Sequence, residues 1–154
     1  MNDTELNSGT IYVYIQTYQL GKKYLLRALE SIKKQTYSNF RCLIYDNCSG
    51  MDTRDMLQEY IKGDSRFSIT YFDETAGHII GWEYGIPEIL YLAGDKGGFY
   101  CRVDADDELE TDCFEKMLAY MKKNDLDMVA SGSSFIDANT MQVLGSRIVA
   151  MSFC

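Results

Sequence analysis

The chain has 154 residues, of which 46% are hydrophobic and 25% charged, a composition typical of a globular protein and not of a disordered one. This length suits one compact domain that buries about 70% of the surface of its unfolded chain. With 15 Lys and Arg against 23 Asp and Glu, the formal charge is -8. Such a charge disfavours a nucleic acid or an anionic membrane as the main partner.

The start of the chain is polar, and no apolar run approaches the roughly 18 residues of a transmembrane helix. We therefore expect a cytoplasmic protein without a transmembrane segment, or one held at the cytoplasmic face of a membrane by a partner or a further segment. The five cysteines contain no C-x-x-C pair, which argues against a disulfide framework and a structural zinc site. Residues 1–9 are expected to be flexible, and residues 10–154 to form a single domain.

Hydrophobic periodicity alternates between the strand and the helix pattern along the chain. "TIYVYI" is a β-rich apolar run, whereas "KKYLLRALESIKKQ" has its apolar residues at helical spacing. Pro87 removes a backbone donor within a helical pattern, so two helical pieces are expected around it. In chain order, the expected elements are a strand at 10–15, a helix at 22–35, a strand at 40–46, a helix at 53–62, a strand at 66–72, a helical segment at 77–94, a strand at 97–104, a helix at 111–124 and a strand at 126–136.

This alternation predicts an α/β fold with an open, mostly parallel sheet and helices on both faces. Sheets of this kind bind ligands beyond the carboxyl ends of their strands. Polar side chains follow the first four expected strands at those ends. They are Thr17 and Tyr18, Asp46 and Asn47, Asp73 and Glu74, and Asp104 and Asp106.

The stretch "FYCRVDADDELETD" places six carboxylates at the end of the strand at 97–104 and directly after it. On an extended segment the side chains of Asp104 and Asp106 would point the same way, and two unit charges about 4 Å apart repel by roughly 4 kcal/mol at an effective dielectric constant near 20. Mg²⁺ or Mn²⁺ would offset this repulsion and usually completes its shell with water and substrate phosphates. The alternative is a solvated acidic loop whose later acids favour the N-terminus of the next helix.

The order and spacing of these motifs resemble the family 2 nucleotide-sugar glycosyltransferases of the Rossmann-like, A-type fold, over roughly residues 10–146. Two stretches carry most of the likeness, "RALESIKKQTYSNFRCLIYDNCS" and "RVDADDELETDCFEKM", the second with its D-x-D motif. The resemblance implies transfer of a sugar, with inversion at the anomeric carbon, from a nucleoside diphosphate sugar. The donor is usually UDP-linked, the metal Mg²⁺ or Mn²⁺, and the acceptor a hydroxyl on a carbohydrate or a lipid-linked molecule.

The resemblance also implies roles for individual residues. A carboxylate can accept the ring N–H of uracil, and a divalent cation can neutralise charge on a departing diphosphate. Asp46 has an alternative role as a strand-end acid that begins an Asx-turn. Carried over by position, the donor-site residues are Thr17 and Tyr18 in the nucleotide cleft, Asp46 on the base, Gly77 in the glycine-led segment, Asp104 on the ribose side and Asp106 on the metal.

The chain departs from the family pattern at two places near these residues. The family usually has Pro and Asn flanking its T-Y pair, where this chain has Gln16 and Gln19. The family also commonly has an Arg-Asn pair in the glycine-led segment, where this chain has Trp82 and Glu83. The second change removes a cation near the expected diphosphate. Candidate replacements are Lys22, Lys23 and Arg102.

The catalytic base of an inverting transferase is not identifiable in this sequence. Such a base is usually a carboxylate, and the family places it well beyond the D-x-D motif on a segment that also forms the acceptor site. After Asp127 the one acid is Asp137, to which we assign no such role. The chain is therefore expected to lack the C-terminal acceptor and base segment. His78, the only histidine, is expected to pack or cap near its loop.

Two hypotheses follow for the function. One is a glycosyltransferase, or its donor-binding half, and the other is a non-catalytic nucleotide-binding module of the same fold. A generic doubly wound nucleotide or signalling domain is a third and weaker option. The chain has no G-x-G-x-x-G after its first strand and no G-x-x-x-x-G-K-[ST], which disfavours dinucleotide and P-loop sites.

Overall fold

The computed structural model describes residues 9–77 and 81–147 of the chain. The expected flexible N-terminus therefore lies almost wholly outside the described residues. The chain divides into two compact units, Met1–Phe114 and Glu115–Cys154. The first unit contains a four-stranded sheet and the second a two-stranded one.

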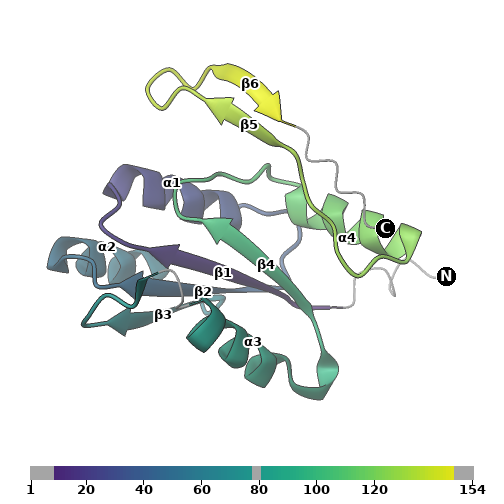
Figure 1. Ribbon diagram of the computed structural model, residues 1–154, viewed down its shortest axis with the longest axis horizontal. Coiled ribbons are helices and arrows are strands. Elements are labelled where there is room, and N and C mark those ends of the chain that lie inside the picture. Colours follow the sequence, from purple (N-terminus) through teal and green to yellow (C-terminus); the bar gives the residue numbers. More distant parts are fainter. Residues whose placement is uncertain (1–8, 78–80, 148–154) are drawn as a thin grey trace. The chain divides into compact units, whose positions relative to one another are not determined.

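A parallel sheet with the strand order β3-β2-β1-β4 forms the centre of the first unit (Figure 1). Its strands are β1 (Ile11–Thr17), β2 (Phe40–Asn47), β3 (Phe67–Phe72) and β4 (Phe99–Asp104). β1 pairs with both β2 and β4, and the register places Ile15 beside Ile44 on one side and Val103 on the other. Because all the pairs are parallel, the carboxyl ends of the strands meet at one edge of the sheet.

The helices cover both faces of this sheet, as the sequence predicts. α1 (Lys22–Lys33) and α2 (Met51–Ile61) lie on one side, and α3 (Ile86–Ala93) lies on the other (Figure 1). A π-helical turn, η2 (Gly81–Gly85), precedes α3, and a 3₁₀ turn, η3 (Gly94–Lys96), follows it. Pro87 lies in the first turn of α3, where no intrahelical donor is needed. The helical run is continuous from Gly81 to Ala93, and it changes from a π-helical turn to an α-helix just before Pro87.

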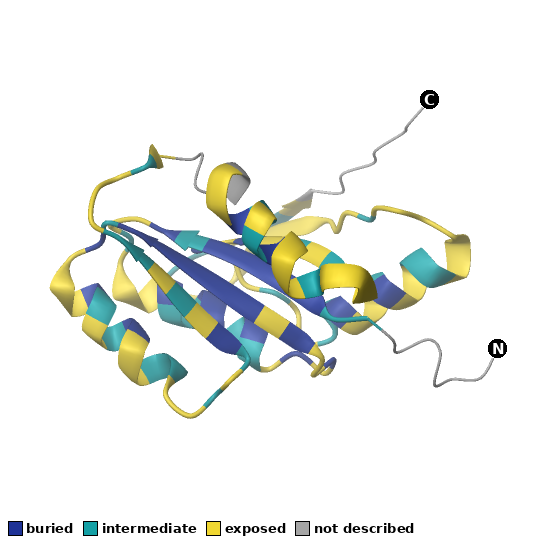
Figure 2. Cartoon of the chain, turned by 90° about the horizontal axis from the view of Figure 1, so that it is seen from below, coloured by how far each residue is buried: buried dark blue, intermediate teal, exposed yellow. Residues whose placement is uncertain are grey.

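The core follows the alternation of side chains along β1 and β2, which are buried along most of their lengths (Figure 2). On the face toward α3, Ile89 packs into a cluster of strand residues. On the other face, α1 contributes Leu25, Leu29 and Ile32, all fully buried. The strand residues packed with Ile89 are Tyr12, Tyr14, Leu43 and Tyr45.

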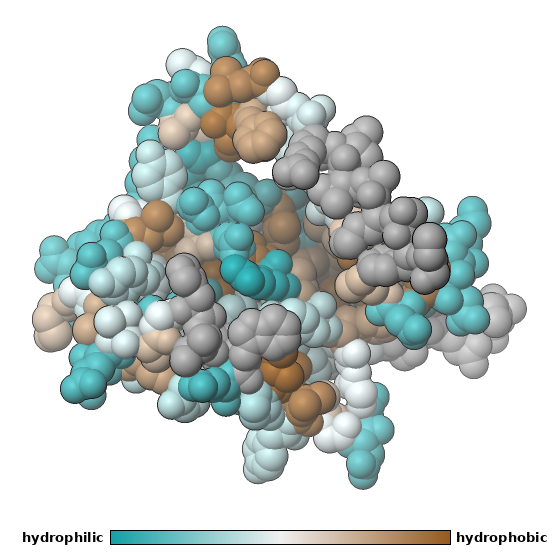
Figure 3. All heavy atoms as spheres, in the orientation of Figure 1, coloured by the Kyte–Doolittle hydropathy of each residue, from teal (hydrophilic) through white to brown (hydrophobic). Residues whose placement is uncertain are grey.

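The second unit corrects the expected strand at 126–136. Only β5 (Ser133–Ile136) is a strand there, and it pairs antiparallel with β6 (Val143–Arg147) instead of extending the parallel sheet. The reason is the turn at Asp137, whose Oδ1 accepts hydrogen bonds from the backbone N–H groups of Asn139 and Thr140 at 2.9 and 2.7 Å and reverses the chain. Figure 3 shows apolar surface on this hairpin. The helix α4 (Cys113–Asn124) matches its expected range closely.

Candidate functional site

The ends of β1 and β2 bring together Thr17 and Asp46, which are register partners and are both completely buried. One carboxylate oxygen of Asp46, Oδ2, accepts a hydrogen bond from Arg54 Nε at 2.9 Å, and the Ser49 N–H lies 3.3 Å from both carboxylate oxygens. Within the described residues, the hydroxyls of Thr17 and Ser49 are buried without a hydrogen-bond partner. Such hydroxyls lose their hydration without compensation, so a ligand group that bonds to them would stabilise this site.

Arg54 of α2 joins the end of β2 to the end of β3, and the sequence analysis missed it. Besides its hydrogen bond to Asp46, Arg54 donates from Nη1 to Asp73 Oδ1 at 3.3 Å and from Nη2 to the carbonyl of Phe72 at 2.5 Å. Its guanidinium also lies 5.1 Å from the centroid of the Tyr71 ring. The hydrogen bond to Asp46 is the main cause that raises the pKa of Arg54. One arginine on a predicted helix gives no sequence signal for contacts with two separate strands.

Gly77 is held against the sheet edge by two side-chain amides. Gln16 Nε2 and Asn47 Nδ2 both donate to the Gly77 carbonyl, at 2.8 and 3.2 Å, while Asn47 Oδ1 accepts from the Ala76 N–H at 2.8 Å. Gln16 Oε1 in turn accepts from the Tyr14 hydroxyl at 2.8 Å. Gly77 has a φ of 65°, a conformation that glycine adopts without a steric cost. Gln16, which departs from the family pattern, therefore fixes the loop that follows β3.

The D-x-D motif lies in a tight turn rather than on an extended strand. β4 ends at Asp104, and the Asp107 N–H donates to the Asp104 carbonyl at 3.0 Å, which places Ala105 and Asp106 at the centre of the turn. The expectation that Asp104 and Asp106 lie two apart on an extended segment is therefore wrong. Partial burial, and next the charges of Asp106 and Asp104, raise the pKa of Asp107. The three carboxylates thus still interact, and Asp107 joins the two that the sequence singled out.

Asp104 is paired with Arg102 on its own strand. Arg102 donates from Nε and Nη2 to Asp104 Oδ1 at 3.1 and 2.9 Å. The register places Asp104 beside Gln16 and Arg102 beside Tyr14, so this pair lies on the face of the sheet that α3 covers. Both side chains of the pair are more than half exposed.

The sheet register determines which predicted residues lie together. Thr17 and Asp46 share one face of the sheet, whereas Gln16 and Asp104 share the other. The two groups meet at one edge with β1 between them, and β2 and β4 are two strand spacings, or about 10 Å, apart. Tyr18 follows β1 and is 48% exposed. The edge therefore carries all the predicted donor residues that the structure describes, in two neighbouring groups.

His78 and the side chain of Trp82 lie outside the described residues. Lys22, a candidate replacement for the missing cation, begins α1 and forms an exposed ion pair with Asp52 at 3.4 Å.

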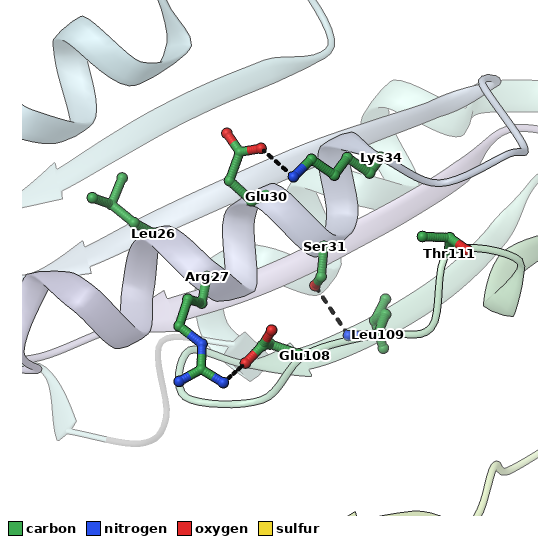
Figure 4. A pocket seen from close by; sticks show the side chains of 8 residues that line it. All are labelled: Leu26, Arg27, Glu30, Ser31, Lys34, Glu108, Leu109 and Thr111. Carbon is green, nitrogen blue, oxygen red and sulfur yellow. Dashed lines mark hydrogen bonds and ion pairs between the residues drawn. The ribbon is translucent and has the colours of Figure 1, made fainter. Parts of the chain in front are cut away.

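A hollow of about 390 Å³ lies elsewhere in the first unit, between α1 and the loop that follows the D-x-D turn (Figure 4). Its charged side chains are paired, Arg27 with Glu108 and Lys34 with Glu30. The Leu109 N–H donates to Ser31 Oγ at 3.0 Å across it. The contacts of Glu108 and Leu109 tie the loop that follows the D-x-D turn to α1.

Comparison with known proteins agrees with this fold. The family model for glycosyl transferase family 2 matches residues 12–145, so the chain belongs to glycosyltransferase family 2. It is 30% identical to the O-antigen biosynthesis glycosyltransferase WbnJ of Escherichia coli over 118 residues, which cover 76% of this chain and 44% of that protein. The chain spans less than half the length of this and other curated relatives that it matches.

Solved structures with the A-type glycosyltransferase fold share the architecture. TarS 1–349 of S. aureus in complex with UDP-GlcNAc superposes with a TM-score of 0.58 at 22% identity and covers 75% of this chain and 32% of that one. The mannosyltransferase PcManGT of Pyrobaculum calidifontis, in complex with GDP-Man and Mn²⁺, superposes with a TM-score of 0.57 at 17% identity. The match covers 85% of this chain and 36% of that one. At these identities the likeness shows the fold alone, and it confirms the predicted fold class. None of the helices within residues 9–77 and 81–147 has the length and apolar character of a membrane span.

We expect Arg54→Met to lower the melting temperature more than Lys62→Met does. The first change leaves the buried Asp46 carboxylate without its cation, a costly state. The second removes an exposed pair with Glu59, and such pairs contribute little. Thermal unfolding followed by circular dichroism measures both. Asp46→Asn in the Arg54→Met background should recover part of the loss, and equal shifts for the two single variants would contradict this role of Arg54.

Asp107→Asn should raise the melting temperature at pH 7 in the presence of a chelator. The pKa of Asp107 is raised in the folded chain. The ionised carboxylate therefore lowers the free energy of unfolding at any pH above the pKa values of Asp107 in the folded and the unfolded chain. This penalty fades as the pH falls through the folded pKa and is absent below about 3.9, the usual pKa of an unfolded Asp. Unfolding curves between pH 3 and 7 give the profile. Asp95→Asn, at the other end of β4, is the control of equal charge change, and an identical profile for both variants would refute the assignment.

Proposed function

We propose that this chain is the donor-binding portion of an inverting glycosyltransferase that uses a UDP-linked sugar with Mg²⁺ or Mn²⁺. The acceptor in this proposal is a hydroxyl on a carbohydrate or lipid-linked molecule, and the location is cytoplasmic. The observation that carries the proposal is the register of β1 with β2 and β4, which brings Thr17, Asp46 and Asp104 to one edge of the sheet in a family 2 chain. A ligand beyond the strand ends would contact all three strands.

The base of the donor is assigned to the Thr17 and Asp46 side of the edge. The unpartnered hydroxyls of Thr17 and Ser49 supply hydrogen-bonding groups for a polar ring, and a carboxylate has about four lone-pair sites, so Asp46 can accept a uracil N–H besides its present bonds. Because Asp46 is completely buried, the base must displace part of its cover. In this proposal Tyr18, half exposed after β1, covers the nucleotide.

The metal is assigned to Asp106 in the D-x-D turn. Within the described residues, no three His, Cys, Asp or Glu side chains are arranged to hold an ion. This fits a site in which one or two carboxylates share the ion with substrate phosphates. The oxygen donors of Asp106 and Asp107 suit Mg²⁺ or Mn²⁺, and the raised pKa of Asp107 reflects in part the negative charge that an ion would offset. A bound ion would neutralise charge on the departing diphosphate.

Within this chain we assign no general base for the acceptor. Asp137 does not suit that role, because hydrogen bonds from the Thr140 and Asn139 backbone lower its pKa and make it a weaker base. Its carboxylate closes the turn between β5 and β6 instead.

UDP with Mn²⁺ is expected to raise the melting temperature of the chain, because a ligand that binds only the folded state stabilises it. At about 100 times its dissociation constant the gain is about 2.7 kcal/mol. Asp106→Ala should remove most of the metal-dependent part of this gain. Differential scanning fluorimetry with UDP, GDP and ADP, each with and without Mn²⁺, measures the shifts.

The matched control is Asp95→Ala, an exposed acid in η3 before β4, which should respond to UDP and Mn²⁺ as the unaltered chain does. If GDP raises the melting temperature and UDP and ADP do not, the assignment of uracil as the base is wrong and the donor site stands. If no nucleotide moves the melting curve at millimolar concentration, donor binding by this chain is wrong.

A further inference from the structure

Arg102 is a cation held at the sheet edge with donors to spare. Its Nε and Nη2 groups both bond to Asp104 Oδ1, and within the described residues its Nη1 makes no hydrogen bond. Arginine has five N–H donors in a planar fork, so about three remain for another partner. The side chain is 61% exposed, which leaves these donors accessible from solvent.

Arg102 is the register partner of Tyr14, whose side chain connects to the loop that carries Gly77. Burial raises the pKa of the Tyr14 phenol to about 12, and the charge of Arg102 opposes the rise. The Tyr14 hydroxyl bonds to Gln16, and Gln16 bonds to the Gly77 carbonyl. Arg102, Asp104 and the Gly77 loop therefore belong to the same group on the α3 face of the edge.

Two other arginines of the first unit are already committed. Arg54 uses Nε, Nη1 and Nη2 on Asp46, Asp73 and the Phe72 carbonyl, and Arg27 is paired with Glu108 at the hollow beside α1. Lys22, in an exposed ion pair with Asp52, has no planar fork of donors. Arg102 combines exposure, a fixed guanidinium and unused donors at the strand ends.

We propose that Arg102 recognises the diphosphate of the donor and that Asp104 positions it for this role. The inference rests on the proposed function and assigns the phosphate contact within it. An arginine fork can bond two phosphate oxygens at once and stays charged. This chain has Trp82 and Glu83 where the family commonly has Arg and Asn. In our proposal β4 supplies the cation for the diphosphate instead, through Arg102. Its positive charge also offsets the charge of Asp104, which would otherwise repel a diphosphate.

The test compares UDP and UMP as probes, each titrated with Mn²⁺ into the unaltered chain, Arg102→Gln and Arg102→Lys by isothermal calorimetry. Loss of a charge-assisted contact should reduce the preference for UDP over UMP roughly tenfold in Arg102→Gln. Arg102→Lys keeps the charge and loses the planar fork, so its preference for UDP over UMP should lie between those of the unaltered chain and Arg102→Gln. The control is Arg41→Gln, which removes an exposed arginine from the start of β2 and should leave the preference unchanged.

A second readout separates phosphate recognition from a structural role. Removing Arg102 frees the Asp104 carboxylate, so Arg102→Gln should bind Mn²⁺ alone roughly threefold to tenfold more tightly by electron paramagnetic resonance, although it binds UDP more weakly. The melting temperature without ligand should not change, since the pair is exposed. An unliganded Arg102→Gln chain that melts clearly earlier would make Arg102 a structural residue and overturn the proposal.

The outcomes also separate this inference from the function on which it rests. If the unaltered chain binds UDP with Mn²⁺ and Arg102→Gln keeps the same preference for UDP over UMP, Arg102 does not recognise the diphosphate and the donor site stands. If the unaltered chain binds neither nucleotide, the proposed function fails and this inference fails with it.

Discussion

The parallel pairing of β1 with both β2 and β4 is the constraint on which the rest of the structure depends. This pairing brings the ends of three strands to one edge of the sheet, with Thr17 beside Asp46 and Gln16 beside Asp104. A register slip of one residue would move each side chain to the opposite face, and it would also expose the apolar side chains that α1 and α3 cover. The packing of the core and the placement of the site therefore have the same cause.

Around this edge, side chains of neighbouring elements hold the loops in place. Arg54 draws the end of β3 to the buried carboxylate of Asp46, while Gln16 and Asn47 hold the Gly77 carbonyl. The two groups differ in exposure, because Asp46 is completely buried and Asp104 is more than half exposed. This asymmetry suits a ligand with a polar ring at one end and a charged, metal-associated group at the other.

The sequence predicted the alternation of strands and helices and the acids at the strand ends, because periodicity and strand-end polarity are local properties. It did not predict that Asp106 lies in a turn, since the hydrogen bond from Asp107 to Asp104 leaves no compositional trace. The function of Arg54 depends on contacts with β2 and β3 that no spacing rule contains. The composition of the segment at 126–136 predicts a strand of the parallel sheet, because it does not reveal that Asp137 turns the chain back into a hairpin.

The central claim is that a nucleoside diphosphate and a divalent ion occupy the edge formed by β1, β2 and β4. The most direct measurement is a crystal structure of the chain with UDP and Mn²⁺, with the metal located by its anomalous scattering. The account predicts a manganese peak beside Asp106, the uracil ring beside Thr17 and Asp46, and the diphosphate between them. A manganese peak away from the D-x-D turn, or a uridine bound in the hollow between α1 and Leu109, would contradict it.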